Sequence, residues 1–245
     1  MTQKDDIDTG DYRMTGILYG IGVGPGDPDM MTLKAVKAIK DADVICLPRA
    51  EKDKCRAYQI ALLAVPEIRY KKAISMEFEM TKDEERLKEL HQDFYNKYKQ
   101  LLLEGYNLAF ITIGEPTVYS TFGYIMKLAK KDGIEVELIN GITSFTGAAA
   151  SAGTLLCEGD ENVHIISGQG DLDDELRMSG TKIIMKSGRN LSEIKQKLVA
   201  LEEQGLVDVY AVSDCGMETE QIFSSAMTIP EYSRYMLTII VKEKK

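Results

Sequence analysis

The residues of this sequence that could support chemistry lie in short turns, each directly after an apolar, strand-like segment. Loops beyond the carboxyl ends of parallel strands are where α/β sheets bind ligands. Glycine, proline and small hydroxyl side chains dominate these turns, so we expect a site built from loops and backbone groups. The turns are Gly22-Val-Gly-Pro-Gly-Asp-Pro28, Gly114-Glu-Pro-Thr-Val-Tyr-Ser120, Asn140-Gly-Ile-Thr-Ser-Phe-Thr-Gly147, Met185-Lys-Ser-Gly-Arg189 and Ser213-Asp-Cys-Gly-Met217.

The first turn stands where a dinucleotide-binding fingerprint would stand, but its pattern does not match. A GxGxxG motif beginning at Gly22 would require glycine at the position of Asp27, and one beginning at Gly20 would require it at Pro25. No GK[ST] sequence is present, which excludes a Walker A loop. A carboxylate facing the turn would also repel phosphate. The pattern favours a turn selected for its shape and disfavours a nucleotide-binding oxidoreductase.

The other turns allow two interpretations each. Glu115 either complements the dipole at a helix start or belongs to a pocket floor of backbone donors. Thr143 or Ser144 is expected to cap the following helix. Lys186 and Arg189 are ordinary solvated charges unless an acidic ligand lies beside them.

No familiar catalytic constellation occurs in the chain. The four cysteines are far apart, only two histidines are present, and no Ser/His/Asp, Cys/His or metal-ligand spacing is found. We expect reduced, structural thiols and no protein-bound metal. The protein therefore either binds a ligand without chemistry or performs chemistry that needs mainly positioning.

The elements that must hold these turns alternate between strand and helix. Residues 16–139 predict a mostly parallel α/β domain, and residues 140–245 predict a second domain with a mixed sheet and adjacent antiparallel strands from Gln221 onward. Residues 1–15 are polar, acidic and predicted to be a disordered leader. The strongest helix prediction is 82–104, where Leu87, Leu90, Phe94 and Tyr98 share an apolar stripe. Further helices are predicted at 32–40, 118–131 and 190–203.

Composition restricts the partners. The 245 residues carry a net charge of -9 at pH 7, which disfavours a general attraction to nucleic acid or anionic lipid. No apolar run approaches the ~20 residues of a membrane helix. Residues 1–13 lack the apolar region of a secretory signal. We expect a cytoplasmic protein.

Taken together and in order, the five turns resemble those of the tetrapyrrole (corrin/porphyrin) methyltransferase family. The variants Tyr-Ser-Thr-Phe122 and Met-Lys-Ser-Gly-Arg189 are most similar to its precorrin-2/cobalt-precorrin-2 (cobalt-factor II) C20-methyltransferase branch, in cobalamin biosynthesis. The resemblance covers about residues 16–241. It implies two α/β domains with a ligand cleft between them, a homodimer, and S-adenosylmethionine as the methyl donor.

The resemblance also implies which residues contact the donor. Two positions depart from the family pattern: Glu115 replaces the usual aspartate of a Gly-Asp-Pro sequence, and Asn140 replaces the usual proline. The implied contacts are Pro25, Gly114, Glu115, Pro116, Val118, Tyr119, Ser144, Phe145, Met185, Cys215 and Gly216.

The implied chemistry agrees with the missing constellations. A sulfonium is already a strong electrophile and the meso carbon of a reduced tetrapyrrole resembles an enamine, so alignment supplies much of the catalysis, about 7–11 kcal/mol in favourable cases. A base must still accept the C20 proton. Glu115 is a candidate for that role.

The substrate carries many carboxylates, which we expect a local basic rim to bind. Its predicted members are Arg49, Lys52, Lys54 and Arg56, with Lys186 and Arg189 across the cleft. The alternative is that all six are ordinary surface charges, which the interleaved Glu51 and Asp53 support.

The leading functional hypothesis is C20 methylation of cobalt-precorrin-2 or cobalt-factor II. Its alternatives are the same reaction on metal-free precorrin-2, methylation at another ring position, methylation of a protein residue as in diphthine synthesis, and a module that binds without turnover.

Overall fold

The computed structural model describes residues 15–49, 51–75, 83–231 and 236–244, and it forms two compact units. The first unit contains the described residues up to Ile21 together with 33–112 and 119–140. The second contains 141–245 together with two loops, 22–32 and 113–118, that come from the N-terminal half of the sequence. The predicted domain boundary at residue 140 stays a prediction, and the predicted leader lies outside the described residues except for Thr15.

The first unit is built on a parallel sheet, as the alternation of strands and helices predicts. Its strand order is β3-β2-β4-β1-β5, and β1 pairs in parallel with β5 while β2 pairs in parallel with β3 and β4. Sequence analysis did not find β3, a short edge strand with no fully buried residue. The strands are β1 Leu18–Gly22, β2 Val44–Leu47, β3 Lys72–Ser75, β4 Leu108–Thr112 and β5 Val136–Ile139.

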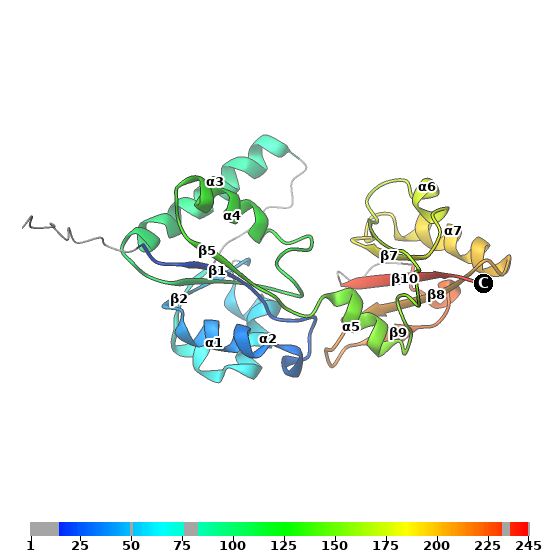
Figure 1. Ribbon diagram of the computed structural model, residues 1–245, viewed down its shortest axis with the longest axis horizontal. Helices are drawn as coiled ribbons and strands as arrows, with labels where there is room; N and C mark the ends of the chain where they lie inside the picture. The colour runs from blue at the N-terminus through cyan, green and yellow to red at the C-terminus, as the bar shows by residue number, and fades with distance from the viewer. Residues whose placement is uncertain (1–14, 50, 76–82, 232–235, 245) are drawn as a thin grey trace, which may run out of the picture. The chain divides into compact units, whose positions relative to one another are not determined.

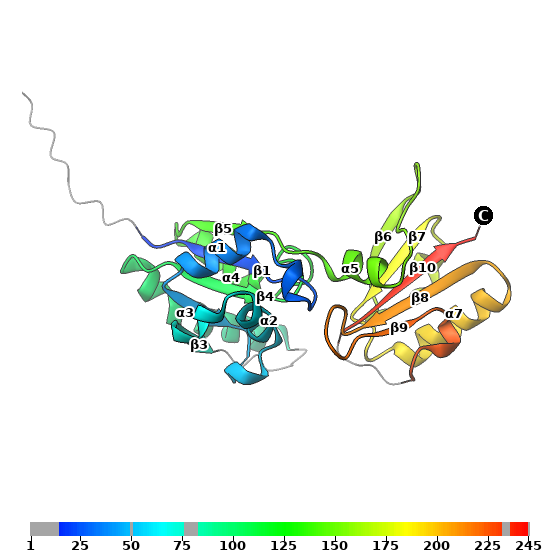
Figure 2. The same cartoon turned by 90° about the horizontal axis from the view of Figure 1, so that it is seen from below.

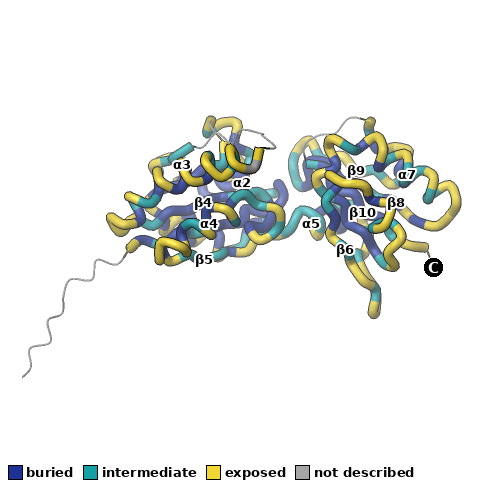
Figure 3. Tube along the Cα trace, turned by 90° about the horizontal axis from the view of Figure 1, so that it is seen from above, coloured by how far each residue is buried: buried dark blue, intermediate teal, exposed yellow. Residues whose placement is uncertain are grey.

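Helices cover both faces of this sheet. Figure 1 shows α3 and α4 on one face and α1 and α2 on the other. Phe94, Tyr98, Phe110 and Phe122 form the centre of the core under α3 and α4. Figure 3 shows the buried chain in the strands and the exposed chain on the outer turns of the helices. The helices are α1 Leu33–Asp41, α2 Arg56–Ala64, α3 Glu84–Leu103 and α4 Phe122–Lys131, with short 3-10 helices at Lys52–Lys54 and Pro66–Tyr70. A further 3-10 helix, Pro28–Met30, lies in a loop of the second unit.

Helix α3 begins close to where the sequence predicts, and its one histidine is buried. Asp83 caps the helix by accepting hydrogen bonds from the backbone N–H groups of Glu85 and Arg86. His91 lies off the apolar stripe of this helix, yet it is 6% exposed and its ring stacks on Tyr124 of α4 at 4.2 Å between centroids. It is buried because α4 covers that side of the helix as well.

Helix α4 starts later than predicted. The sequence favours a helix from Val118, but Tyr119 has a φ of 50°, a left-handed conformation that no helix can contain. The Ser120 hydroxyl accepts a hydrogen bond from the Phe122 backbone N–H at 3.2 Å, so the helix begins only there.

The second unit contains a mixed sheet, which Figure 2 shows with its strands in the order β6-β7-β10-β8-β9. β6 and β7 are parallel, whereas β10 is antiparallel to both β7 and β8. β9 and β10 were predicted to be adjacent, but each pairs antiparallel with β8, which lies between them. The strands are β6 Val163–Ser167, β7 Thr181–Met185, β8 Val207–Ser213, β9 Gln221–Phe223 and β10 Leu237–Glu243.

Two helices pack on opposite faces of this second sheet. α7 buries Ile194 and Leu198 on one face, and α5 packs Ala148 and Ala149 against Val212 and Ile240 on the other. The small side chains of α5 permit close packing on the strands. The helices are α5 Ser144–Ser151, α6 Asp173–Leu176, α7 Leu191–Glu203 and the 3-10 helix Ala226–Thr228. In the described parts of the chain, no helix has the combination of length and apolar character that crossing a bilayer requires.

Candidate binding site

The first two glycine turns are joined by backbone hydrogen bonds. Gly114 N–H donates to the Gly24 carbonyl at 2.7 Å, and Gly24 N–H donates back to the Gly114 carbonyl at 3.3 Å. Gly114 has a φ of 69°, which favours glycine over any residue with a side chain. The turns that follow β1 and β4 therefore form a single structure inside the second unit.

The third turn packs against the same carbonyl. A Cβ atom placed on Gly141 would lie 2.1 Å from the Gly114 oxygen, and one placed on Gly22 would lie 2.4 Å from it. Neither distance is compatible with van der Waals contact. The glycines thus permit three backbones to meet, which agrees with the interpretation of the first turn as one selected for shape.

Glu115 ties two of these turns together and is 6% exposed. One carboxylate oxygen, Oε1, accepts hydrogen bonds from the Thr117 backbone N–H at 3.0 Å and from its hydroxyl at 2.7 Å. The other, Oε2, accepts the Gly141 backbone N–H at 3.0 Å. The third turn then enters α5, where the Thr143 side chain caps the helix by accepting the Thr146 backbone N–H. Thr143 is one of the two capping residues that the sequence predicts.

The fifth turn, at the end of β8, contacts the first turn. A Cβ atom on Gly26 would lie 2.2 Å from the Cys215 carbonyl oxygen, and one on Gly216 would lie 2.6 Å from the Asp27 nitrogen. Gly147 of α5 faces both segments, since its added Cβ would lie 3.0 Å from Pro25 Cγ and 3.1 Å from Cys215 Sγ. Four of the five sequence motifs are therefore in mutual contact.

The Cys215 side chain is buried, and burial raises the pKa of its thiol. The Ser151 hydroxyl, 3.8 Å from the sulfur, lowers that pKa, whereas the nearby Glu220 raises it. Ser151 also donates to Glu220 Oε2 at 2.9 Å. A buried cysteine of this kind packs as a small apolar group.

The fourth turn, Met185–Arg189, lies at the same end of the sheet as the fifth, because the strands β7 and β8 both run antiparallel to β10 and so end together. Lys186 follows β7 with a φ of 57° and Asp214 follows β8 with a φ of 50°. Together with Tyr119 they are the three non-glycine residues with positive φ in the described chain, and all three lie in the motifs. Strained backbone of this kind gathers at functional sites.

Buried polar groups at this edge lack partners. The hydroxyl oxygens of Ser187, after β7, and Ser213, at the end of β8, are buried and accept or donate no hydrogen bond within the described structure. Such a group costs about 1–3 kcal/mol when it is left unsatisfied. A ligand that hydrogen-bonds with them would recover that cost.

The electrostatic character of the loop cluster is acidic. The buried charged side chains in these motifs are Glu115 and Asp214, whereas Lys186 and Arg189 are exposed. A cationic ligand suits this cluster, and a phosphate does not.

The residues of the predicted basic rim can each be described only within their own unit. Lys54 pairs with Glu51 at 2.7 Å. Lys52 Nζ lies 4.6 Å from the centre of the Tyr58 ring and donates weakly to the Arg69 carbonyl at 3.4 Å. Arg49 is exposed, Arg56 is half-buried, and these four residues belong to the first unit, whereas Lys186 and Arg189 belong to the second. The rim stays a prediction.

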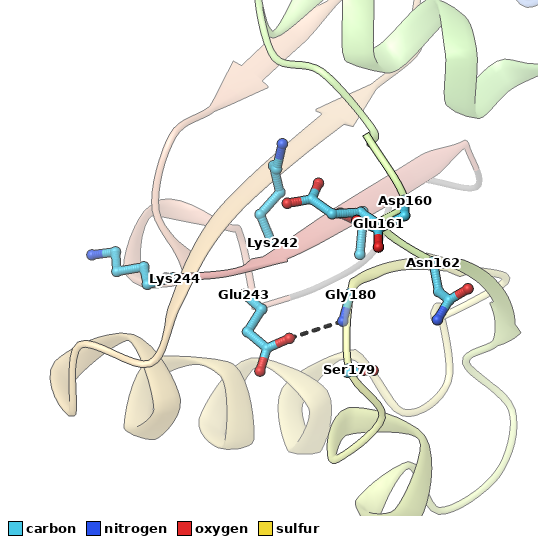
Figure 4. Close-up of a pocket in the computed structure, with 9 residues that line it drawn as sticks. Asp160, Glu161, Asn162, Ser179, Gly180, Lys242, Glu243 and Lys244 are labelled. Atoms are coloured by element: carbon cyan, nitrogen blue, oxygen red, sulfur yellow. Dashed lines mark hydrogen bonds between the residues drawn. The ribbon is translucent and has the colours of Figure 1, made fainter. Parts of the chain in front are cut away.

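A surface cavity of about 360 Å³ lies elsewhere, at the other edge of the second sheet, where β7 begins and β10 ends. Figure 4 shows Glu243 in this cavity, accepting the Gly180 N–H at 2.9 Å, with Glu161 and Lys242 nearby. No predicted site residue lines it. Among the residues the structure describes, no three His, Cys, Asp or Glu side chains gather as metal ligands would.

The structure thus brings Pro25, Gly114, Glu115, Cys215 and Gly216 into one cluster. Pro116 and Val118 follow in the same loop, Ser144 and Phe145 begin α5, and Met185 ends β7 at the edge described above. Tyr119 is 43% exposed and falls in the first unit. Ser151 and Glu220 were not predicted as site residues, because nothing in their spacing signals contact with distant loops. Ser187 and Ser213 lie inside the predicted motifs but were not named as contacts.

Comparison with known proteins identifies a family. Residues 17–230 match the family model of the tetrapyrrole (corrin/porphyrin) methylases. A Methanocaldococcus jannaschii protein named a probable cobalt-precorrin-2 C(20)-methyltransferase is 36% identical over 93% of this chain and 96% of its own length. A Sinorhizobium precorrin-2 C(20)-methyltransferase is 32% identical over 76% of this chain and 79% of its own.

Solved structures share the fold. A cobalt-precorrin-4 methyltransferase superposes with a TM-score of 0.69 at 20% identity, covering 94% of this chain and 95% of its own. The Thermus thermophilus uroporphyrin-III C-methyltransferase complexed with S-adenosylhomocysteine has a TM-score of 0.65 at 20% identity, covering 93% of this chain and 97% of its own.

Proposed function

This chain belongs to the tetrapyrrole (corrin/porphyrin) methylase family, and we propose that it transfers a methyl group from S-adenosylmethionine to C20 of cobalt-precorrin-2 or cobalt-factor II in cobalamin biosynthesis. The observation that carries the proposal is the loop cluster of the second unit, in which four motifs far apart in sequence meet through their backbones. The similarity to the two C20-methyltransferases selects the position of methylation.

The loop cluster fits a donor of this kind. S-adenosylmethionine carries a sulfonium and an ammonium, which suit a cluster whose buried charges are acidic. Its ribose, adenine and carboxylate offer hydrogen bonds to neutral groups, and Ser187 and Ser213 have hydroxyls without partners at this edge. We propose that Pro25, Gly114, Pro116, Ser144 and Met185 hold it. The other proposed contacts are Glu115, Val118, Tyr119, Phe145, Cys215 and Gly216.

When bound, the donor supplies an electrophilic methyl group that requires no metal or covalent activation by the protein. The chain's own contribution is position. Backbone bonds between Gly24 and Gly114, and the Glu115 bridge to Gly141, fix the loops before any ligand arrives. Pre-organisation of this type lowers the entropic part of the barrier. Burial raises the pKa of the Cys215 thiol, which disfavours the thiolate that would compete as a methyl acceptor.

Both Glu115 carboxylate oxygens already accept hydrogen bonds from protein groups. Those contacts support a role in holding the loops. A role as acceptor of the C20 proton remains a proposal, and it requires substrate within hydrogen-bond reach of one oxygen.

Cobalt enters this proposal as part of the substrate. The alternative is C20 methylation of metal-free precorrin-2, which the Sinorhizobium relative's name supports. Turnover of cobalt-loaded and metal-free precorrin-2 by the same enzyme preparation, with the product's methyl position assigned by NMR, separates the two. A product methylated elsewhere on the ring would overturn the C20 assignment.

Donor binding is tested directly by calorimetric titration with S-adenosylhomocysteine and, separately, NAD. We expect a dissociation constant in the micromolar range for S-adenosylhomocysteine and no measurable heat of binding for NAD. Binding of NAD alone would overturn the proposal in favour of an oxidoreductase.

A homodimer in the cytoplasm, without nucleic acid or membrane partners, completes the proposal. The net charge of -9 supports the absence of polyanionic partners. Light scattering coupled to size-exclusion chromatography measures the oligomeric state.

A further inference from the structure

We propose that Glu220 is a positioning residue of the donor site, which it serves by fixing the loop at the end of β8; this inference rests on the proposed function. Glu220 lies outside the five sequence motifs, in the turn between β8 and β9. Its backbone N–H donates to the Met217 carbonyl at 2.9 Å, which directs the side chain back toward the loop.

The contact that carries the inference is made by one carboxylate oxygen. Glu220 Oε2 accepts the Gly216 backbone N–H at 2.6 Å and the Ser151 hydroxyl at 2.9 Å. Ser151 is the last residue of α5, the helix that follows the third turn. One half-buried carboxylate therefore links the fifth turn to the helix that follows the third turn.

The loop held in this way is the one that packs against the first turn. Gly216 approaches Asp27 and the Cys215 carbonyl approaches Gly26 so closely that neither glycine can carry a Cβ atom. Any displacement of Gly216 therefore changes its spacing from Pro25 and its neighbours. Glu220 acts through Gly216 and Cys215 and is not itself proposed to contact the donor.

The chain contains a matched control for this arrangement. Glu202 Oε2 accepts the Ser225 hydroxyl at 2.7 Å and the Ala226 backbone N–H at 3.0 Å, which is the same pair of bonds between α7 and a 3-10 helix. None of the motifs is involved there. The variant E202A removes equivalent bonds and reports the effect on stability alone.

The side-chain chemistry predicts how substitutions at 220 rank. Because a single oxygen accepts both bonds, the amide oxygen of glutamine can replace it, so E220Q should rescue the geometry without the charge. Aspartate keeps the charge but is one methylene shorter and cannot reach both groups. If Glu220 acts by positioning, E220Q should bind the donor analogue more tightly than E220D and E220A. If its charge matters instead, E220D should bind more tightly than E220Q.

The experiment measures S-adenosylhomocysteine affinity by calorimetry and the KM values of both substrates for wild type, E220A, E220Q, E220D and E202A in the full chain. We expect E220A and E220D to weaken S-adenosylhomocysteine binding about tenfold, because one or both hydrogen bonds from Gly216 and Ser151 to residue 220 are lost. The KM for S-adenosylmethionine should rise with it while the KM for the tetrapyrrole changes little. E220Q and E202A should stay within about twofold of wild type.

If wild type binds S-adenosylhomocysteine and E220A and E220D bind it with the same affinity, the inference is overturned and the proposed function stays intact. Equal losses in E220A and E202A would also overturn it, since the effect would then be general destabilisation. Absence of binding by wild type would overturn the proposed function itself. If E220A does not fold, the comparison of E220D with E220Q decides the question.

Discussion

The Glu115 carboxylate accepts the Gly141 backbone N–H at 3.0 Å, and this bond connects the turn after β4 to the turn after β5. The second oxygen of the same carboxylate accepts the Thr117 backbone N–H at 3.0 Å. Both oxygens thus face N–H donors, which sets this residue apart from Glu220, where one oxygen accepts both bonds.

Glutamine should not replace Glu115. Whichever way the amide of E115Q is turned, its NH₂ group faces a backbone N–H, and one buried donor is left unsatisfied. We expect E115Q to lose about 1–3 kcal/mol of unfolding free energy, measured by urea titration, and to bind S-adenosylhomocysteine more weakly. A variant as stable as wild type would contradict the bridge.

Glycine substitutions should distinguish backbone strain from steric overlap. At Gly114 an added Cβ has room, because the nearest atom lies 3.7 Å away. G114A should therefore lower the free energy of unfolding only through its left-handed φ, by about 1–2 kcal/mol. G141A should cost more, because its Cβ would lie 2.1 Å from the Gly114 carbonyl oxygen. The control G123A, in α4 with open space around it, should be neutral or stabilising by up to about 1 kcal/mol. Equal effects of G114A and G141A in urea unfolding would contradict the proposed packing.

Stability should fall as the pH falls through the range of histidine. Burial lowers the pKa of His91 in the folded state, so the unfolded chain takes up a proton first, near an ordinary pKa of about 6.5. The contribution of neutral His91 to the free energy of unfolding is fully present above that pH. It is lost progressively below it, until the pH is also below the folded-state pKa. Urea midpoints between pH 8 and 5 should show this slope in wild type and in H164Q, but less of it in H91F, which keeps a ring against Tyr124. If the urea midpoints of H91F fell with pH as steeply as those of wild type, His91 would not be the cause of the slope.

Charge reversal tests the predicted basic rim. R49E and R56E should each raise the tetrapyrrole KM tenfold or more, on the order of 1.4 kcal/mol, with little change in the KM for S-adenosylmethionine. The control K88E reverses an exposed charge on α3 and should leave both constants unchanged. An unchanged tetrapyrrole KM in both arginine variants would remove the rim from the proposal.

The sequence by itself determined the elements whose signal is local. The apolar period of α3 and the glycine turns follow from residue spacing, which depends only on helix and strand geometry. Short or weakly patterned elements such as α2 and β3 were missed. Five motifs in order also sufficed to recognise the family, because their combination is far more specific than any one turn.

Only the tertiary structure decided which of these residues meet. The glycines of the first three turns serve close packing between backbones that are far apart in sequence. Glu115 reaches Gly141 across 26 positions of the chain, and Glu220 reaches Ser151 across 69. The left-handed φ of Tyr119 and the burial of His91 likewise depend on neighbours that arrive from elsewhere in the chain. Spacing along the chain carries no record of such contacts, since they form only when folded elements bring distant backbones together.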